Sequence, residues 1–106
     1  MTLNVFGRSL GPGHHHGRHH NHNHQVSITI GRPFRGGVIG GVGPLRTDYG
    51  ALPVDGETGA GHAGAGVKAA DTLAAFGQTV LQAVGAEPSL ITSPQGTGRV
   101  IAAALA

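Results

Sequence analysis

Histidine dominates one short segment of this chain, residues 14–24. Neutral imidazole is a good ligand for zinc, nickel and copper, and two or three imidazoles from one segment can reach the same ion. The alternative is a low-complexity surface loop that binds metal only incidentally. The segment therefore predicts metal binding and leaves open whether the site is specific. Its histidines are His14, His15, His16, His19, His20, His22 and His24.

The second half of the segment, H-N-H-N-H over residues 20–24, alternates strictly. In an extended chain, alternate side chains lie on one side, which would bring these three imidazoles together. We expect a zinc or nickel ion there. The candidate ligands are His20, His24, His22 and His19.

Four further polar residues lie downstream and could complete a shell of oxygen and nitrogen ligands: Asp48, Asp55, Glu57 and His62. No spacing rule requires this, and the alternative is that each is a solvated turn residue. The chain has no cysteine, which excludes thiolate zinc sites and disulfides. Its glycine-rich run over residues 36–43 lacks the lysine and the following helix of a phosphate-binding loop, and no serine lies in a G-x-S-x-G elbow. We therefore name no catalytic residue.

The clearest predicted element is a helix over about residues 71–84. Apolar residues recur there with helical spacing, Asp71 is a natural N-cap and Gly85 suits the position after the helix. We expect the apolar stripe to be the most buried surface of the chain. It consists of Leu73, Phe76, Val80, Leu81 and Val84.

Two short strands precede this helix in the prediction, giving an α/β fold class. Residues 25–30 alternate apolar and polar, as a half-buried strand does, and residues 37–42 form a second, glycine-rich strand. We expect a histidine-rich loop at 14–24 and a glycine-rich loop at 43–66. Residues 89–93 are short and mixed, and residues 99–105 fit either a closing helical turn or a strand.

We predict one incomplete segment rather than a self-sufficient domain. It would comprise a lead-in at 1–13, the histidine-rich loop at 14–24, strands at 25–42, the glycine-rich loop at 43–66, and the helix with the C-terminal end at 67–106. Among 106 residues there are 20 Gly, 6 Pro, one Tyr and no Trp, so we expect a thin core.

Charge and hydropathy limit the partners. Charged residues are 11% of the chain and the formal net charge is +2, which does not favour nucleic acid. No apolar run approaches the roughly 20 residues of a membrane helix, and the first ten residues lack the pattern of a signal peptide. We expect no membrane partner.

The order of motifs resembles the C-terminal part of a large bacterial family of unknown function that is sulfatase-like and belongs to the alkaline-phosphatase superfamily. The matching pieces are V-F-G-R-S at 5–9, G-R-H-H-N-H-N-H-Q at 17–25, F-R-G-G-V-I-G-G at 34–41, G-A-L-P-V-D at 50–55, and the helix that follows. The family pattern there is S-E-F-G-R-T, G-R-D-H, G-G-x-x-G-G, P-V-D and a terminal helix.

This resemblance implies an alkaline-phosphatase-like sheet-and-helix fold, of which this chain would be the C-terminal piece. It implies an exported or periplasmic protein, because the family usually carries a twin-arginine signal, and relatives that are metal-dependent hydrolases. His20 matches the family histidine after G-R-D, a candidate metal ligand, and Gly7 and Arg8 match the F-G-R turn. Val5 stands where the family has an acid and His19 where it has Asp. The missing N-terminal part of the protein would be a partner.

A second function remains open. The chain would then be a small histidine-rich protein that binds zinc or nickel without enzymatic activity, and everything outside the histidine-rich segment would be scaffold.

Overall fold

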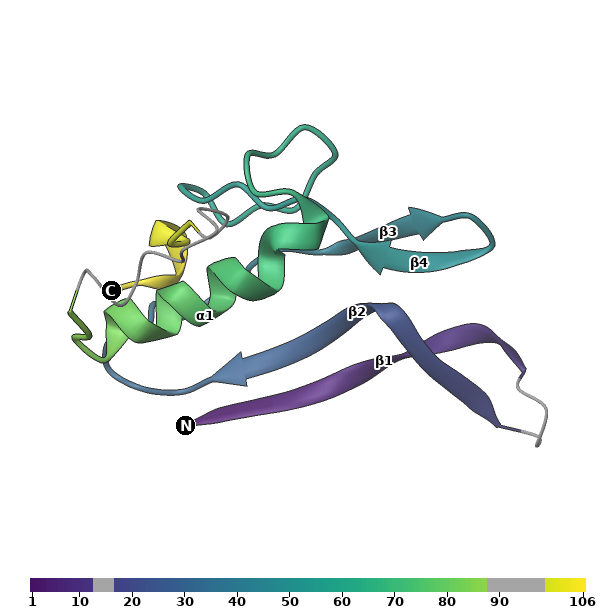
Figure 1. Ribbon diagram of the computed structural model, residues 1–106, viewed down its shortest axis with the longest axis horizontal. Coiled ribbons are helices and arrows are strands. Elements are labelled where there is room, and N and C mark those ends of the chain that lie inside the picture. The colour runs from purple at the N-terminus through teal and green to yellow at the C-terminus, as the bar shows by residue number, and fades with distance from the viewer. Residues whose placement is uncertain (13–16, 88–98) are drawn as a thin grey trace. The chain divides into compact units, whose positions relative to one another are not determined.

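The computed structural model describes residues 1–12, 17–87 and 99–106, and it is a mixed α/β protein with two small antiparallel sheets and one helix (Figure 1). The chain divides into two compact units. We call residues 1–30 with 42–51 the sheet unit, and residues 31–41 with 52–106 the helix unit.

The sheet unit contains two antiparallel pairs of strands. The long strands β1 (Thr2–Pro12) and β2 (Arg18–Thr29) pair with each other, and β3 (Val42–Leu45) pairs with β4 (Asp48–Ala51) through a two-residue turn. The turn residue Arg46 adopts a left-handed φ of 57°.

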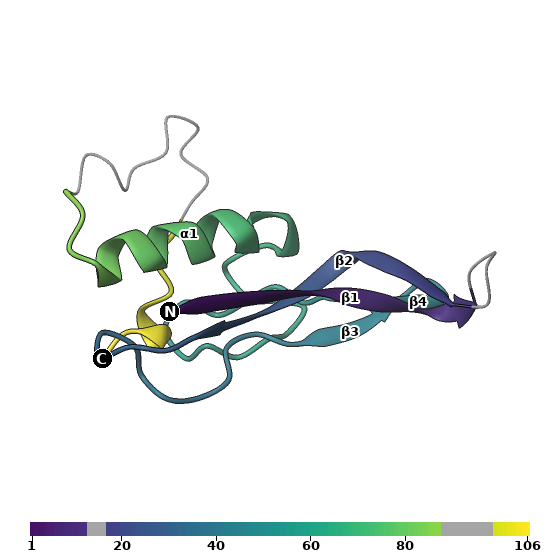
Figure 2. The same cartoon turned by 90° about the horizontal axis from the view of Figure 1, so that it is seen from below.

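The register of β1 and β2 is regular over one half and interrupted in the other. Leu3 lies opposite Ile28 and Val5 opposite Val26. Phe6 pairs with Gln25, and the next pair joins residue 7 to residue 21. Three residues of β2 between these two pairs therefore have no paired residue in β1. Such extra residues bend a strand. Both views show this bend part-way along β2 (Figures 1 and 2).

The helix unit is built around α1 (Thr72–Ala83), which follows the short 3₁₀ turn η1 (Ala69–Asp71). Gly85 ends the helix with a φ of 76°, and its N–H donates to the carbonyl of Gln82 while the N–H of Ala86 donates to that of Leu81. This pair of bonds is a Schellman motif. The predicted helix and its glycine stop are therefore confirmed. Asp71 occupies the N-cap position, but its side chain makes no capping hydrogen bond.

The core of the helix unit is small. Its buried apolar side chains are Val54, Val67, Ala75 and Ile101. Val54 and Val67 exchange two backbone hydrogen bonds of 2.8 and 2.9 Å. The C-terminal turn η2 (Ala102–Ala104), in yellow next to α1 in Figure 1, closes the unit, so the helical-turn alternative for residues 99–105 holds.

The expected burial of the helix stripe is wrong. Leu73 is 65% exposed and Val84 70% exposed, whereas the buried residues of α1 are Ala75, Gln78 and Thr79. The reason lies in the segment that packs on the helix: the hydroxyl of Thr79 accepts a 2.9 Å hydrogen bond from the backbone N–H of Ile101. The apolar stripe does not determine which face of α1 packs against the rest of the unit. Periodicity shows which face of a helix is apolar, but it does not show which face another segment contacts.

Several expected loops and strands also differ. The lead-in at 1–13 contributes the eleven-residue strand β1, and the histidine-rich segment is a strand from residue 18 onward rather than a loop. Strands β3 and β4 lie at 42–51, so they begin at the last residue of the strand expected at 37–42 and continue into the loop expected at 43–66. Residues 37–41 form no strand. Backbone pairing decides these cases, because histidine and asparagine can extend a ladder without burying apolar surface. Residues 89–93 lie outside the described residues.

No helix in the described part of the chain is long and apolar enough to cross a membrane.

Candidate functional site

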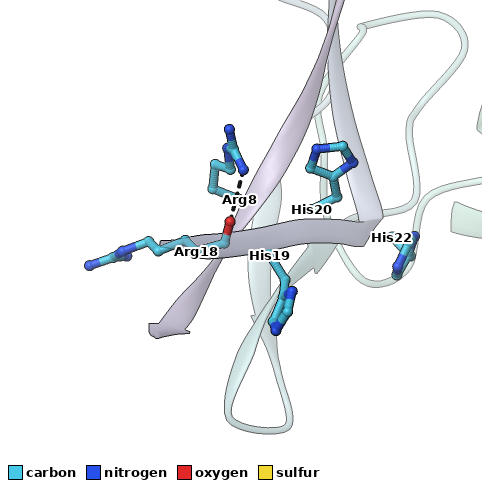
Figure 3. A pocket seen from close by; sticks show the side chains of 5 residues that line it. All are labelled: Arg8, Arg18, His19, His20 and His22. Carbon is cyan, nitrogen blue, oxygen red and sulfur yellow. Dashed lines mark hydrogen bonds between the residues drawn. The ribbon is translucent and has the colours of Figure 1, made fainter. Parts of the chain in front are cut away.

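The histidine-rich strand β2 contributes three histidines to an open pocket on the sheet unit. Two arginines complete its lining, and all five residues are exposed. Figure 3 shows Arg8 and His20 on one side of the strand and His19 on the other, with Arg18 directed outward. The lining residues are Arg8, Arg18, His19, His20 and His22.

Each arginine side chain donates a hydrogen bond to a backbone carbonyl of the opposite strand. Arg8 donates from Nη1 to the carbonyl of Arg18 at 2.8 Å (Figure 3). Arg18 donates from Nη1 to the carbonyl of Ser9 at 3.3 Å. A guanidinium carries five N–H donors, so each of these bonds uses only one of them. The pocket therefore keeps two fixed positive charges beside its imidazoles.

His20 lies against the F-G-R residues 6–8, which form part of strand β1 and not the expected turn. Arg8 is its partner in the strand register, and the ring of Phe6 stacks on the imidazole with centroids 3.7 Å apart and 28° between the planes. The guanidinium carbon of Arg8 lies 5.0 Å from the centre of the same Phe6 ring. Stacking uses the face of the imidazole and leaves its two nitrogens at the edge. The F-G-R residues of β1 and the G-R-H-H segment thus meet at His20.

His24 has a different environment from His20. Its ring packs over Gly7, where a Cβ would overlap it, and its Nδ1 is buried without a hydrogen-bond partner among the described residues. Burial blocks access of a metal ion to this Nδ1 atom. The ring itself packs in the bend of β2.

Asn21 is the feature that sequence analysis missed. It is 6% exposed between two exposed histidines. Its side-chain amide donates to the carbonyl of Tyr49 at 2.9 Å and to Asp48 Oδ1 at 3.3 Å, and its Oδ1 accepts from the N–H of Asn23 at 2.8 Å. Asn21 therefore anchors β2 to β4. The available signal was the H-N-H alternation, which places asparagine on the face opposite His20 and His22.

The downstream acids act as turn and strand residues. The two Asp48 oxygens each lie 3.3 Å from the N–H of Leu10, and Oδ1 also accepts from the N–H of Tyr49 at 2.8 Å. Asp55 accepts from the N–H groups of Glu57 and Thr58 at 2.9 Å each. These bonds, the one from Thr58 first, hold the pKa of the Asp55 carboxyl below its usual range. Asp48 belongs to the sheet unit, whereas Asp55, Glu57 and His62 belong to the helix unit.

The fit to a metal ion is partial. The exposed imidazoles of His19, His20 and His22 are suitable donors for zinc or nickel. The positive charges of Arg8 and Arg18 repel a metal cation, and among the described residues no carboxylate lines the pocket. Among residues 1–12, 17–87 and 99–106, no three His, Cys, Asp or Glu side chains lie close enough to hold one ion. A metal would have to draw its ligands together as it binds.

Comparison with models of known protein families, with curated proteins and with solved structures finds no match for this chain.

Proposed function

We propose that this chain is the C-terminal segment of a sulfatase-like, exported protein of unknown activity, that it is catalytically silent alone, and that its histidine-rich segment binds a divalent metal ion. The contact of His20 with Phe6 and Arg8 carries the proposal. These residues belong to two motifs separated along the chain, and the resemblance requires both motifs in one site. The neighbouring histidines would then supply the remaining ligands.

The four candidate ligands have different surroundings, and we assign them different roles. His20 and His22 are exposed at the pocket, and His19 lines it from the other side of the strand. His24 supports the bend of β2 through Gly7. We therefore place metal binding on His20 with help from His19 and His22, and we assign His24 to positioning the strand.

Zinc titration by calorimetry tests this assignment. In the proposed site, His20→Ala weakens zinc binding more than His15→Ala does, and His62→Ala, in the other unit, leaves it unchanged. Binding should fade as the pH falls below about 6.5, because protonated imidazole has no lone pair for the metal. Equal small losses for His20→Ala and His15→Ala would remove the specific site.

Activity assays test the other half of the proposal. The chain alone should not hydrolyse p-nitrophenyl phosphate or p-nitrophenyl sulfate, with or without zinc. An upstream reading frame that encodes a Ser, Thr or Cys nucleophile and further acids would support a longer hydrolase. If the isolated chain hydrolysed either substrate and His20→Ala abolished that activity, the proposal that the chain is catalytically silent alone would be contradicted.

The second candidate is a small histidine-rich chelator without enzymatic activity. The spread of the imidazoles favours it, because His19 and His20 point to opposite sides of the strand (Figure 3). In a chelator any histidine replaces another, so single substitutions would have equal small effects and the upstream region would encode no nucleophile.

A further inference from the structure

The formal positive charge of this chain lies in the sheet unit. The helix unit contains four basic and four acidic residues, whereas the sheet unit contains three arginines and a single acid, Asp48. The Asp48 carboxylate already accepts hydrogen bonds from two backbone N–H groups and from the side chain of Asn21. The only acid of this unit is therefore engaged in holding strands together.

Two of these three arginines line the pocket on the sheet unit. Arg8 and Arg18 each donate one hydrogen bond to a backbone carbonyl, which is a neutral acceptor. A guanidinium is always charged and carries five N–H donors, so each arginine keeps its charge and further donors. Among the described residues no carboxylate lines the pocket. The lining thus brings two fixed positive charges to one place without a negative charge to balance them.

The ring of Phe6 orients the donors on one side of this pocket. The guanidinium carbon of Arg8 lies 5.0 Å from the centre of the Phe6 ring, and the imidazole of His20 stacks on the same ring. Arg8 and His20 are also partners in the strand register and lie on the same side of the strand (Figure 3). A neutral imidazole has one N–H donor at its edge, which stacking leaves open. Arg8 and His20 therefore offer N–H donors next to each other, with Phe6 in contact with both.

This chemistry selects an anion. Two fixed positive charges attract a doubly charged anion more strongly than a singly charged one, and the guanidinium fork matches a pair of oxygen acceptors. A nucleic acid would need a longer track of positive charge than two arginines provide. We propose that the pocket binds a small dianion, with Arg8 and His20 as hydrogen-bond donors and Arg18 as the second charge. The anion site does not depend on metal binding.

The exposure of the pocket sets the character of this binding. All five lining residues are exposed, so water and salt screen their charges. Exposed ion pairs contribute little individually, and the anion should therefore bind weakly and more weakly still at high salt.

Amide NMR of the full chain tests the site, with sulfate and malonate as probes because both are dianions near neutral pH. Metal is first removed on a chelating resin, which separates this test from the zinc titration, and sodium chloride keeps the ionic strength constant. At least one dianion should shift the amide signals of Arg8 and Arg18 saturably and bind about tenfold more tightly than chloride. The tighter probe shows whether the pocket prefers a tetrahedral oxyanion or a dicarboxylate. Shifts that never saturate, or equal affinity for chloride and both dianions, overturn the proposal.

A pair of matched variants separates the pocket from net charge. Arg8→Gln removes one charge and its fork from the pocket and should weaken binding of the tighter dianion about tenfold, because hydrogen bonds between charged groups are the strong ones. Arg32→Gln removes the same charge from the helix unit and should change the affinity less than about twofold. Equal losses for the two variants overturn the proposal.

A second measurement uses the unaltered chain and so covers the case in which Arg8→Gln fails to fold. Phenylglyoxal reacts with exposed guanidinium groups, and mass spectrometry of the digested chain gives the rate at each arginine. The tighter dianion, at twice its dissociation constant, should slow the reaction of Arg8 about threefold and leave that of Arg32 unchanged. Equal slowing at both arginines, or none at Arg8, overturns the proposal.

Discussion

The imidazole of His24 fills the space that a side chain at Gly7 would occupy. Gly7 lies just after the last regular pair of β1 with β2. At this point three residues of β2 have no paired residue in β1, and β2 bends. The close approach of the ring explains why glycine stands at this point. The same contact joins the F-G-R residues of β1 to the histidine-rich strand β2 through packing.

Gly7→Ala should therefore destabilise the sheet unit. A methyl group must displace the His24 ring, and overpacking of this kind costs about 1–3 kcal/mol. His24→Ala in the same chain should recover most of the loss. The measurement is the free energy of unfolding of the two single variants and the double variant. Additive losses in the double variant would show that the two residues do not contact each other.

Thr79→Val should destabilise the helix unit. Thr79 is 3% exposed, and its hydroxyl donates to the carbonyl of Ala75 at 2.7 Å and accepts from the N–H of Ile101. Valine leaves that buried N–H without an acceptor, at a cost of about 1–3 kcal/mol. Thr79→Ser keeps the hydroxyl and is the control. Urea denaturation and amide exchange at Ile101 report the effect; unchanged protection of that amide in the valine variant would contradict the structure.

Substitutions on two faces of α1 should have effects opposite to those expected from hydropathy. Leu73→Ala removes an exposed side chain and should change the free energy of unfolding by less than about 0.5 kcal/mol. Ala75→Leu inserts a good helix former at a position that is 0% exposed and should cost about 1–3 kcal/mol by overpacking. The free energies of unfolding of the two variants, measured by denaturation, show which face of α1 is packed. A larger loss of stability for Leu73→Ala than for Ala75→Leu would show that the apolar stripe is the packed face.

The Asp55 loop should lose stability in acid. The pKa of the Asp55 carboxyl is lowered in the folded chain, mainly by the hydrogen bond from the N–H of Thr58 and then by the one from the N–H of Glu57. A lowered folded pKa means that the stabilisation is complete above the unfolded value, about 3.9, and is lost as the pH falls through the folded value. Carbon NMR of the Asp55 carboxyl should show a midpoint below 3.9. Asp55→Asn should remove this acid dependence from the amide shifts of Glu57 and Thr58, and a midpoint at or above 3.9 would contradict the prediction.

Local patterns in the sequence were sufficient for α1. Apolar spacing locates the helix and Gly85 ends it, because both signals act within the same segment and the Schellman bonds at Gly85 are local. The alternation of Val26 and Ile28 predicted extended structure for the same reason. The histidine-rich segment likewise supplies its imidazoles by composition alone, and the prediction of metal binding rests on them.

Tertiary structure decided which surfaces meet. The burial of Ala75 and Thr79 depends on the segment around Ile101, more than 20 residues away, and no periodicity within the helix contains that information. Residues 18–24 extend β2 although they include no apolar residue, because β1 supplies the pairing for part of the segment and Asn21 ties it to β4. The contact of His20 with Phe6 follows from that pairing. Sequence alone determined which side chains are present, and long-range pairing determined which of them lie together.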